Sequence, residues 1–300
     1  MNYLWWLTSI FASVVFAMYI FANQVFKLKG SLVMIYRGIG TALVLLPFAF
    51  FITPIDSVAF YILCVFQGLL IAYFDNRLFN ASKRYGAEMT GTIQPISVFF
   101  GLIMWFIIKP ETFMALIESP VRFVLTVAAV IGVILSVLSF KKSRINQLAF
   151  LYLLPSMLSV TVIDLVCKIL MELGSENVWS AIFYYSLITS FIAGIINAVA
   201  FYRGGHSIKE VLLPKNIRCA GISIIIIIVA MYLLKNYSLY LGQNPAYVMA
   251  IIYAYPVWIF LFNNIYARFF NNKVYAKPDV KALVLMVVSI IVLILSVQNG

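Results

Sequence analysis

The sequence has 300 residues, of which 64% are hydrophobic and only 10% are charged, and its mean hydropathy is +1.03. About a quarter of the residues of a soluble domain are charged. The composition therefore excludes a soluble globular protein and indicates a chain whose main solvent is lipid. The net charge of +11 does not indicate nucleic-acid binding, because the basic residues lie in short loops between apolar runs.

The apolar runs predict ten membrane spans. A span needs ~20 apolar residues, and the first run, from Leu4 to Ala22, has neither the basic start nor the cleavage site of a signal peptide, so we expect it to be retained. Backbone groups in hydrocarbon must bond internally and the alternation of barrel strands is absent, so we expect α helices. The predicted spans are approximately 4–22, 32–52, 57–81, 87–108, 123–140, 147–171, 178–202, 218–241, 246–267 and 281–297.

The two halves of the chain resemble each other, most clearly in the ranges 57–137 and 218–297. Gln94-Pro95 in the predicted fourth span aligns with Tyr255-Pro256 in the ninth, and this register places Asp75 opposite Asn236. A shared proline, turn and terminal pattern over ~80 residues is more specific than any single matched residue.

Five spans in each half mean that the second copy starts on the opposite side of the membrane. The predicted fold is therefore all-α and integral to the membrane, with ten transmembrane helices in two inverted five-helix repeats, residues 1–144 and 145–300. Transporters use inverted repeats to build two related conformations around a central site.

The sequence resembles the drug/metabolite transporter superfamily, in particular its EamA-like members. The resemblance rests on 36–46 (YRGIGTALVLL), 78–87 (LFNASKRYGA), 91–95 (GTIQP), 109–111 (KPE) and 237–246 (YSLYLGQNPA), and it departs at 268–273, where the usual glycine-glutamate is missing. It implies a five-plus-five inverted repeat, a central cavity between the halves and transport. It does not imply a substrate, because members carry amino acids, amines, nucleotide sugars and other metabolites.

Basic loop residues fall almost entirely on one face of the predicted topology. The positive-inside rule makes this face cytoplasmic and places both termini outside, whereas family members usually have both termini inside. The opposite face carries only Lys109 and Arg122 as basic loop residues. The basic face carries Lys27, Lys29, Lys83, Arg84, Lys141, Lys142, Arg144, Arg203, Lys209, Lys215, Arg218, Arg268, Lys273, Lys277 and Lys281.

Charged residues inside the spans predict two polar clusters. With a rise of ~1.5 Å per residue, Arg37 and Asp75 lie ~9–10 Å from the basic face, and Lys235 and Asp164 lie ~26–27 Å from it. We therefore predict that Arg37 pairs with Asp75 near one mouth and Lys235 with Asp164 near the other. Asp164 could instead pair with Lys168 one helical turn away. Such charges serve as gates or substrate contacts, or they are structural pairs and snorkelling side chains.

Polar and aromatic residues on the same spans complete the predicted cavity. Aromatic side chains could form a wall for an amine or a flat ring, or they could pack against lipid. The candidate cavity or gate residues are Arg37, Asp75, Gln94, Asp164, Tyr185, Lys235, Asn236, Tyr253, Tyr255 and Trp258.

The predicted function is secondary transport of a small polar or zwitterionic metabolite. No Walker pattern is present, so transport is passive or ion-coupled, with Asp75 or Asp164 as a candidate proton carrier. A flippase for a lipid-linked sugar or polyprenyl carrier is the alternative. An enzyme or scaffold is disfavoured, because one histidine and three scattered cysteines offer no catalytic set or metal site.

Cofactors are not expected. The predicted partners are a small-molecule substrate, a coupling proton or other ion, the lipid bilayer and a second copy in a homodimer, but not nucleic acid. The predicted location is a bacterial cytoplasmic (inner) membrane.

Overall fold

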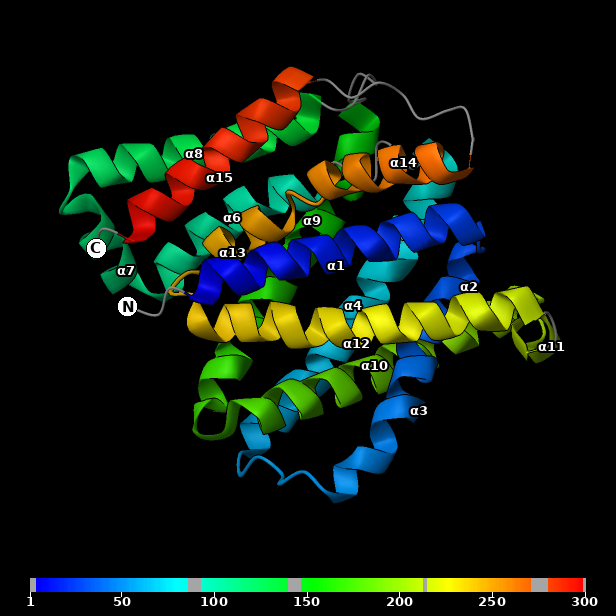
Figure 1. Ribbon diagram of the computed structural model, residues 1–300. Helices are drawn as coiled ribbons and strands as arrows, with labels where there is room; N and C mark the ends of the chain where they lie inside the picture. Colours follow the sequence, from blue (N-terminus) through cyan, green and yellow to red (C-terminus); the bar gives the residue numbers. More distant parts are fainter. Residues whose placement is uncertain (1–3, 86–92, 140–146, 213–214, 271–279, 299–300) are drawn as a thin grey trace.

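The computed structural model describes residues 4–85, 93–139, 147–212, 215–270 and 280–298, and within these ranges it is helical and contains no strand (Figure 1). Short π or 3-10 segments occupy Tyr36–Gly40, Leu46–Phe50 and Ser175–Asn177. The α helices are α1 (Leu4–Phe26), α2 (Gly30–Ile35), α3 (Thr41–Leu45), α4 (Val58–Tyr85), α6 (Ile93–Ile108), α7 (Pro110–Ile117), α8 (Pro120–Ser139), α9 (Gln147–Leu173), α10 (Val178–Arg203), α11 (Ile208–Leu212), α12 (Lys215–Leu241), α13 (Pro245–Ile252), α14 (Pro256–Phe270) and α15 (Val280–Gln298).

Eight helical segments of the described chain are long and apolar enough to cross a bilayer, so the chain is a multi-pass all-α membrane protein. The segments Ile96–Ile108 of α6 and Pro110–Ile117 of α7 are together long and apolar enough, but they meet at a bend of 103°, so they form either a ninth, broken span or a re-entrant loop. The apolar helix Pro120–Ser136 in α8 is shorter than the criterion requires. The count of ten spans stays a prediction. The eight segments are Leu4–Asn23, Gly30–Phe50, Val58–Leu78, Leu151–Leu173, Ser175–Arg203, Ile217–Leu241, Pro245–Tyr266 and Val280–Val297.

Two prolines account for departures from the predicted helix boundaries. The segment from Ile108 to Val121, predicted to be a loop, contains α7, which begins at Pro110; proline is favoured at the first helical position because no N–H is needed there. The predicted ninth span is broken between α13 and α14, and α14 begins at Pro256. A proline ring clashes with the preceding turn, so the helix stops before it.

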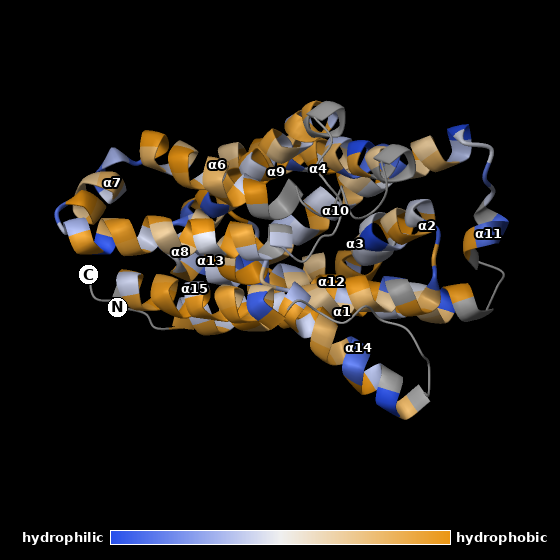
Figure 2. Cartoon of the chain, turned by 90° about the horizontal axis from the view of Figure 1, so that it is seen from above, coloured by the Kyte–Doolittle hydropathy of each residue, from blue (hydrophilic) through white to orange (hydrophobic). Residues whose placement is uncertain are grey.

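The two ends of the bundle are polar and its flanks are apolar. Figure 2 shows hydrophilic residues near α11 at one end and around α7 at the other, with mostly hydrophobic ribbon between them. The start of α1 and the end of α15 both lie at the α7 end. Among the basic residues used for the orientation, Lys141, Lys142, Arg144, Lys273 and Lys277 lie outside the described residues, as do the side chains of Lys83, Arg84 and Lys215.

The helices pack mainly across the boundary between the predicted halves. α1 lies along α12, and α4 lies against both α9 and α10. α8 lies along α15, as Figure 1 also shows, and α6 contacts α13. The second span contacts α10 through its π-helical segment Tyr36–Gly40 and through α3. These contacts enclose a core that runs along the bundle axis.

Two helix backbones approach each other closely at Gly38 and Gly194. Gly38 lies in the π-helical segment, and a Cβ placed on it would collide with the backbone of Gly194 on α10. Only glycine allows two helix backbones to touch in this way. The contact fixes the position of the π-helical turn, and π turns are frequent at functional sites.

We expect Gly38→Ala to destabilise the protein by roughly 1–3 kcal/mol, because the added methyl group forces the second span away from α10. The measurement is the thermal unfolding midpoint in detergent. Gly101→Ala on α6 is the matched control, because its new Cβ would meet nothing closer than Ala246 Cβ at 3.9 Å. Equal midpoints for the two variants would contradict the packing argument.

Candidate functional site

A cavity of about 240 Å³ lies inside the bundle and is lined from α1, the second span, α4, α9, α10, α12 and α13. This volume is below the ~300–1,000 Å³ typical of sites for drug-sized ligands, so the cavity fits a smaller solute. Most of the residues predicted to line a cavity do line it: Arg37, Asp75, Asp164, Tyr185, Lys235, Asn236 and Tyr253.

Arg37 and Asp75 form the first predicted pair. Arg37 Nη1 donates to Asp75 Oδ1 at 2.8 Å, and the two side chains are 21% and 4% exposed. The π-helical turn carries Arg37 and the middle of α4 carries Asp75, so the pair joins two spans of the predicted first half. Charges this far from water are tolerated only when partnered, and here each supplies the other's counter-charge.

Lys235 and Asp164 form the second predicted pair. Lys235 Nζ donates to Asp164 Oδ1 at 2.7 Å, and Tyr253 Oη donates to Asp164 Oδ2 at 3.1 Å. Both carboxylate oxygens of Asp164 are therefore held by protein donors. The alternative pairing of Asp164 with Lys168 does not form, because Lys168 pairs with Glu172, one turn further along α9. The two predicted pairs line one shared cavity rather than two separate mouths.

Three predicted residues lie elsewhere. Tyr255 is buried in the break between α13 and α14, where its ring packs edge-on against Phe16 at 4.9 Å. Trp258 on α14 is half-buried against the apolar core. The side chain of Gln94, in the first turn of α6, lies outside what the structure describes.

The cavity also has lining residues that the sequence reasoning missed. On α1 they are Phe16, Tyr19 and Asn23, and on α12 they are Ile228, Met231 and Tyr232. Each set recurs at three- and four-residue spacing, which marks one face of a helix. The polar groups of Tyr19 and Asn23, in a largely apolar first span, were the sequence feature that could have indicated that this helix faces the cavity.

Buried amides surround the inner part of the cavity. Gln67 Nε2 donates to the Ile163 carbonyl at 2.6 Å and to Tyr185 Oη at 3.3 Å, while Cys167 Sγ donates to Asn236 Oδ1 at 3.1 Å. Asn236 is fully buried, yet its Nδ2 has no hydrogen-bond partner, and neither does Gln67 Oε1. Unpartnered buried polar atoms are rare and each needs a physical explanation.

A second hollow of about 280 Å³ adjoins the cavity on the side of the basic face. Met34 lines both, and Asn76, Asn80, Asn197 and His206 give the second hollow a polar wall. Asn76 Nδ2 donates to Asn197 Oδ1 at 2.9 Å. This hollow lies next to the carboxyl end of α10, toward the α11 end of the bundle, and forms a polar vestibule there.

Glu172 lies at the opposite, α7 end, where it holds two lysine side chains. Its carboxylate receives Lys109 Nζ at 2.7 Å and Lys168 Nζ at 3.3 Å. Lys168, whose side chain is 5% exposed, also donates to the Tyr240 carbonyl at 3.2 Å, and Lys109 lies 5.1 Å from the Trp105 ring centroid. The network connects the end of α6 in the predicted first half to α9 and α12 in the second.

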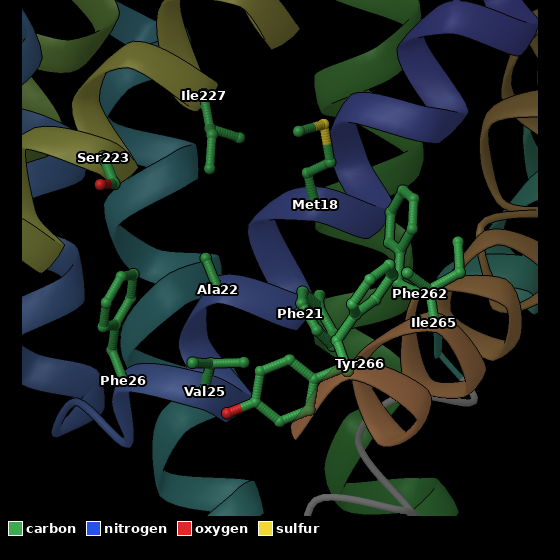
Figure 3. Close-up of a pocket in the computed structure, with 11 residues that line it drawn as sticks. Met18, Phe21, Ala22, Val25, Phe26, Ser223, Ile227, Phe262, Ile265 and Tyr266 are labelled. Atoms are coloured by element: carbon green, nitrogen blue, oxygen red, sulfur yellow. The ribbon is translucent and has the colours of Figure 1, made fainter. Parts of the chain in front are cut away.

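A third hollow, an apolar groove of about 400 Å³, lies outside the polar cavity between α1, α12 and α14. Figure 3 shows Phe21, Ala22 and Val25 of α1 facing Phe262, Ile265 and Tyr266 of α14. The groove shares no lining residue with the cavity that holds the ion pairs.

No family model matches the chain, and no curated protein matches its sequence. Among the described residues, no group of three or more His, Cys, Asp or Glu side chains could hold a metal ion.

We expect Asp75→Asn to destabilise the protein by about 3–5 kcal/mol, because it leaves the Arg37 charge without a counter-charge in the interior. The thermal unfolding midpoint measures this loss, and Arg37→Met combined with Asp75→Asn should recover part of it. Glu210→Gln is the control, because Glu210 meets Lys29, His206 and the Ser207 N–H at the protein surface, where an ion pair contributes little, and its midpoint should change little. A midpoint for Asp75→Asn equal to that of the control would contradict the role of the pair.

Proposed function

We propose that the chain is a secondary transporter that moves a small polar or zwitterionic metabolite across the membrane by alternating access. The observation that carries this proposal is that two ion pairs line a single cavity inside a bundle of apolar helices. A charge in a membrane span costs ~3 kcal/mol or more without a partner or water, and charges that face an interior cavity mark solute pathways.

An inverted repeat of two five-helix halves is part of this proposal. In the proposed halves, α1 and α9 are the first spans, and α4 and α12 are the third. The first span of each half packs on the third span of the other, α1 on α12 and α9 on α4. The second spans meet each other, as do the fourth (α6 and α13) and the fifth (α8 and α15). An exchange of the two halves preserves this contact pattern, which is what a two-fold relation requires.

Ten spans follow if α6 and α8 join the eight long apolar segments. The start of α1 and the end of α15 lie at the same end of the bundle, which requires an even number of crossings (Figures 1 and 2). A ten-span, five-plus-five arrangement is the one expected of an EamA-like member of the drug/metabolite transporter superfamily, and we propose that relationship on this ground.

The conformation is open toward α11 and closed toward α7 in this proposal. The polar vestibule adjoins the cavity at the α11 end, and the contacts of Glu172 with Lys109 and Lys168 join the halves at the other. The α11 end carries the basic loops, so the positive-inside rule makes it cytoplasmic and makes this conformation inward-facing. The membrane would then be the cytoplasmic membrane of a bacterium.

Coupling to an ion is compatible with the cavity but is not required by it. Asp75 and Asp164 are the carboxylates that line it, and each pairs with a cation. Protonation of either would release its partner for a solute, which is how a proton could drive transport. Exchange of two solutes without an ion uses the same residues.

The flippase alternative is less well supported. A lipid-linked sugar needs a polar chamber that opens sideways to lipid, so that the head group and the hydrocarbon tail are held together. The apolar groove between α1, α12 and α14 is the hollow suited to hydrocarbon, and its lining is separate from that of the polar cavity. A small solute without a lipid tail fits this arrangement better.

The test of the proposed function is counterflow in vesicles that contain the purified full-length protein. We expect a radiolabelled polar metabolite to accumulate only when unlabelled solute has been loaded inside, with a rate that saturates, because a carrier exchanges one solute per cycle. A panel of amino acids, amines, nucleosides and sugars covers the class. Thermal stabilisation by lipid-linked sugars alone, with no polar metabolite exchanged, would instead favour a flippase.

A second test concerns the proposal that the ion pairs of Glu172 hold the α7 end closed. Glu172→Gln removes the negative charge that holds Lys109 and Lys168. Because an ion pair of this kind contributes ~1 kcal/mol, its loss should raise the ratio of the conformation open at the α7 end to the closed one by about fivefold. We expect Ile163→Cys in the cavity, in a chain without its native cysteines, to react correspondingly faster with an impermeant thiol reagent added at the α7 face. Glu176→Gln, exposed at the same end, is the control. Equal labelling rates in the Glu172→Gln and Glu176→Gln variants would exclude this role of Glu172.

A further inference from the structure

The α12 side of the cavity has more hydrogen-bond donors than the protein uses. Lys235 Nζ has three N–H groups and donates one hydrogen bond to Asp164. Asn236 Nδ2 has two N–H groups, and neither has a hydrogen-bond partner. Lys235 and Asn236 are adjacent on α12, and both line the cavity. These donors are therefore free for a solute.

The acceptors beside these donors are already occupied. Asp164 accepts Lys235 Nζ on one oxygen and Tyr253 Oη on the other, and Asn236 Oδ1 accepts the Cys167 thiol. A solute group that donates hydrogen bonds would have to displace one of these contacts. A solute group that accepts hydrogen bonds would satisfy donors that otherwise have no partners, which removes the free-energy cost of leaving them unpaired in the interior.

The register of the two halves points to the same chemistry. Asn236 occupies the position in α12 that Asp75 occupies in α4. At the α4 position a carboxylate neutralises Arg37. At the α12 position an amide adds donors beside the Lys235 cation, so the two sides of the cavity differ in the sign of the group they attract.

We propose that Lys235 and Asn236 form an oxyanion subsite, so that the transported solute carries a carboxylate which binds there. The inference rests on the proposed function and narrows its substrate class. A carboxylate supplies two acceptor oxygens, one for the Lys235 ammonium and one for the Asn236 amide. Hydrogen bonds between charged and polar groups of this kind are the stronger ones in proteins.

The experiment uses a matched series of probes on the full-length protein. For an aliphatic, an aromatic and a polar amino acid, the series compares the acid with its carboxamide, with the amine that lacks the carboxyl group and with the acid that lacks the ammonium group. The concentration for half-maximal thermal stabilisation is measured for each. For at least one of the three side chains, we expect the amino acid and the acid without the ammonium group to bind about tenfold or more tightly than the carboxamide and the amine.

Asn236→Ala tests the assignment of the residue. It should weaken carboxylate binding about tenfold or more and weaken carboxamide binding less, because a hydrogen bond to a charged acceptor is stronger than one to a neutral carbonyl oxygen. Asn236→Asp keeps the size of the side chain, serves if the alanine variant does not fold, and should abolish binding of the acids by repulsion. Asn263→Ala is the control, because Asn263 on α14 also has an unpartnered buried amide atom but does not line the cavity.

The outcomes separate the subsite from transport itself. Counterflow of an amine or a sugar with no preference for carboxylates would overturn the subsite and leave the carrier function intact. An unchanged acid-to-amide ratio in both Asn236 variants would overturn the role of this residue. Absence of stabilisation by every acid in the series would also overturn the subsite, while the counterflow panel decides on transport independently.

Discussion

The structure depends on the pairing of charges inside an apolar bundle. Arg37 with Asp75, and Lys235 with Asp164, are held where water is scarce, and each charge is tolerated because its partner lies within hydrogen-bonding distance. Hydrophobic residues of the same size would pack there at less energetic cost. Stability alone therefore does not explain these ion pairs. In the proposed transporter they give the common cavity a polar lining for a solute.

The two ends of that cavity are built differently. Toward α11 the wall continues into a vestibule of amide side chains, which hydrogen-bond water and solutes without fixed charge. Toward α7 one carboxylate, Glu172, holds two lysines and joins helices of both halves. An asymmetry of this kind is expected of one conformation of a carrier, in which contacts at one end are made while those at the other are open. Under the proposed function, this asymmetry would make the α11 end the side from which a solute enters.

Much of the site followed from the sequence through helix geometry. Depth along a helix is proportional to residue number, so charges at equal depth on different spans could be paired before their helices were placed, and both predicted pairs formed. Tyr255 and Trp258 were harder to place, because depth says nothing about which way a side chain points around a helix broken at Pro256. Tyr19 and Tyr232 escaped notice because tyrosines in spans are as common at lipid interfaces as in cavities.

The sequence by itself determined that the chain is a helical membrane protein and that its interior charges come in matched sets. It did so because apolar length and helical rise are properties of the chain alone. Only the tertiary structure decided that both ion pairs line one cavity, that Lys168 binds Glu172 rather than Asp164, and that Asn236 keeps an amide without a partner. These outcomes depend on the rotation and contact of helices distant in sequence, which packing at close approaches such as Gly38 and Gly194 sets.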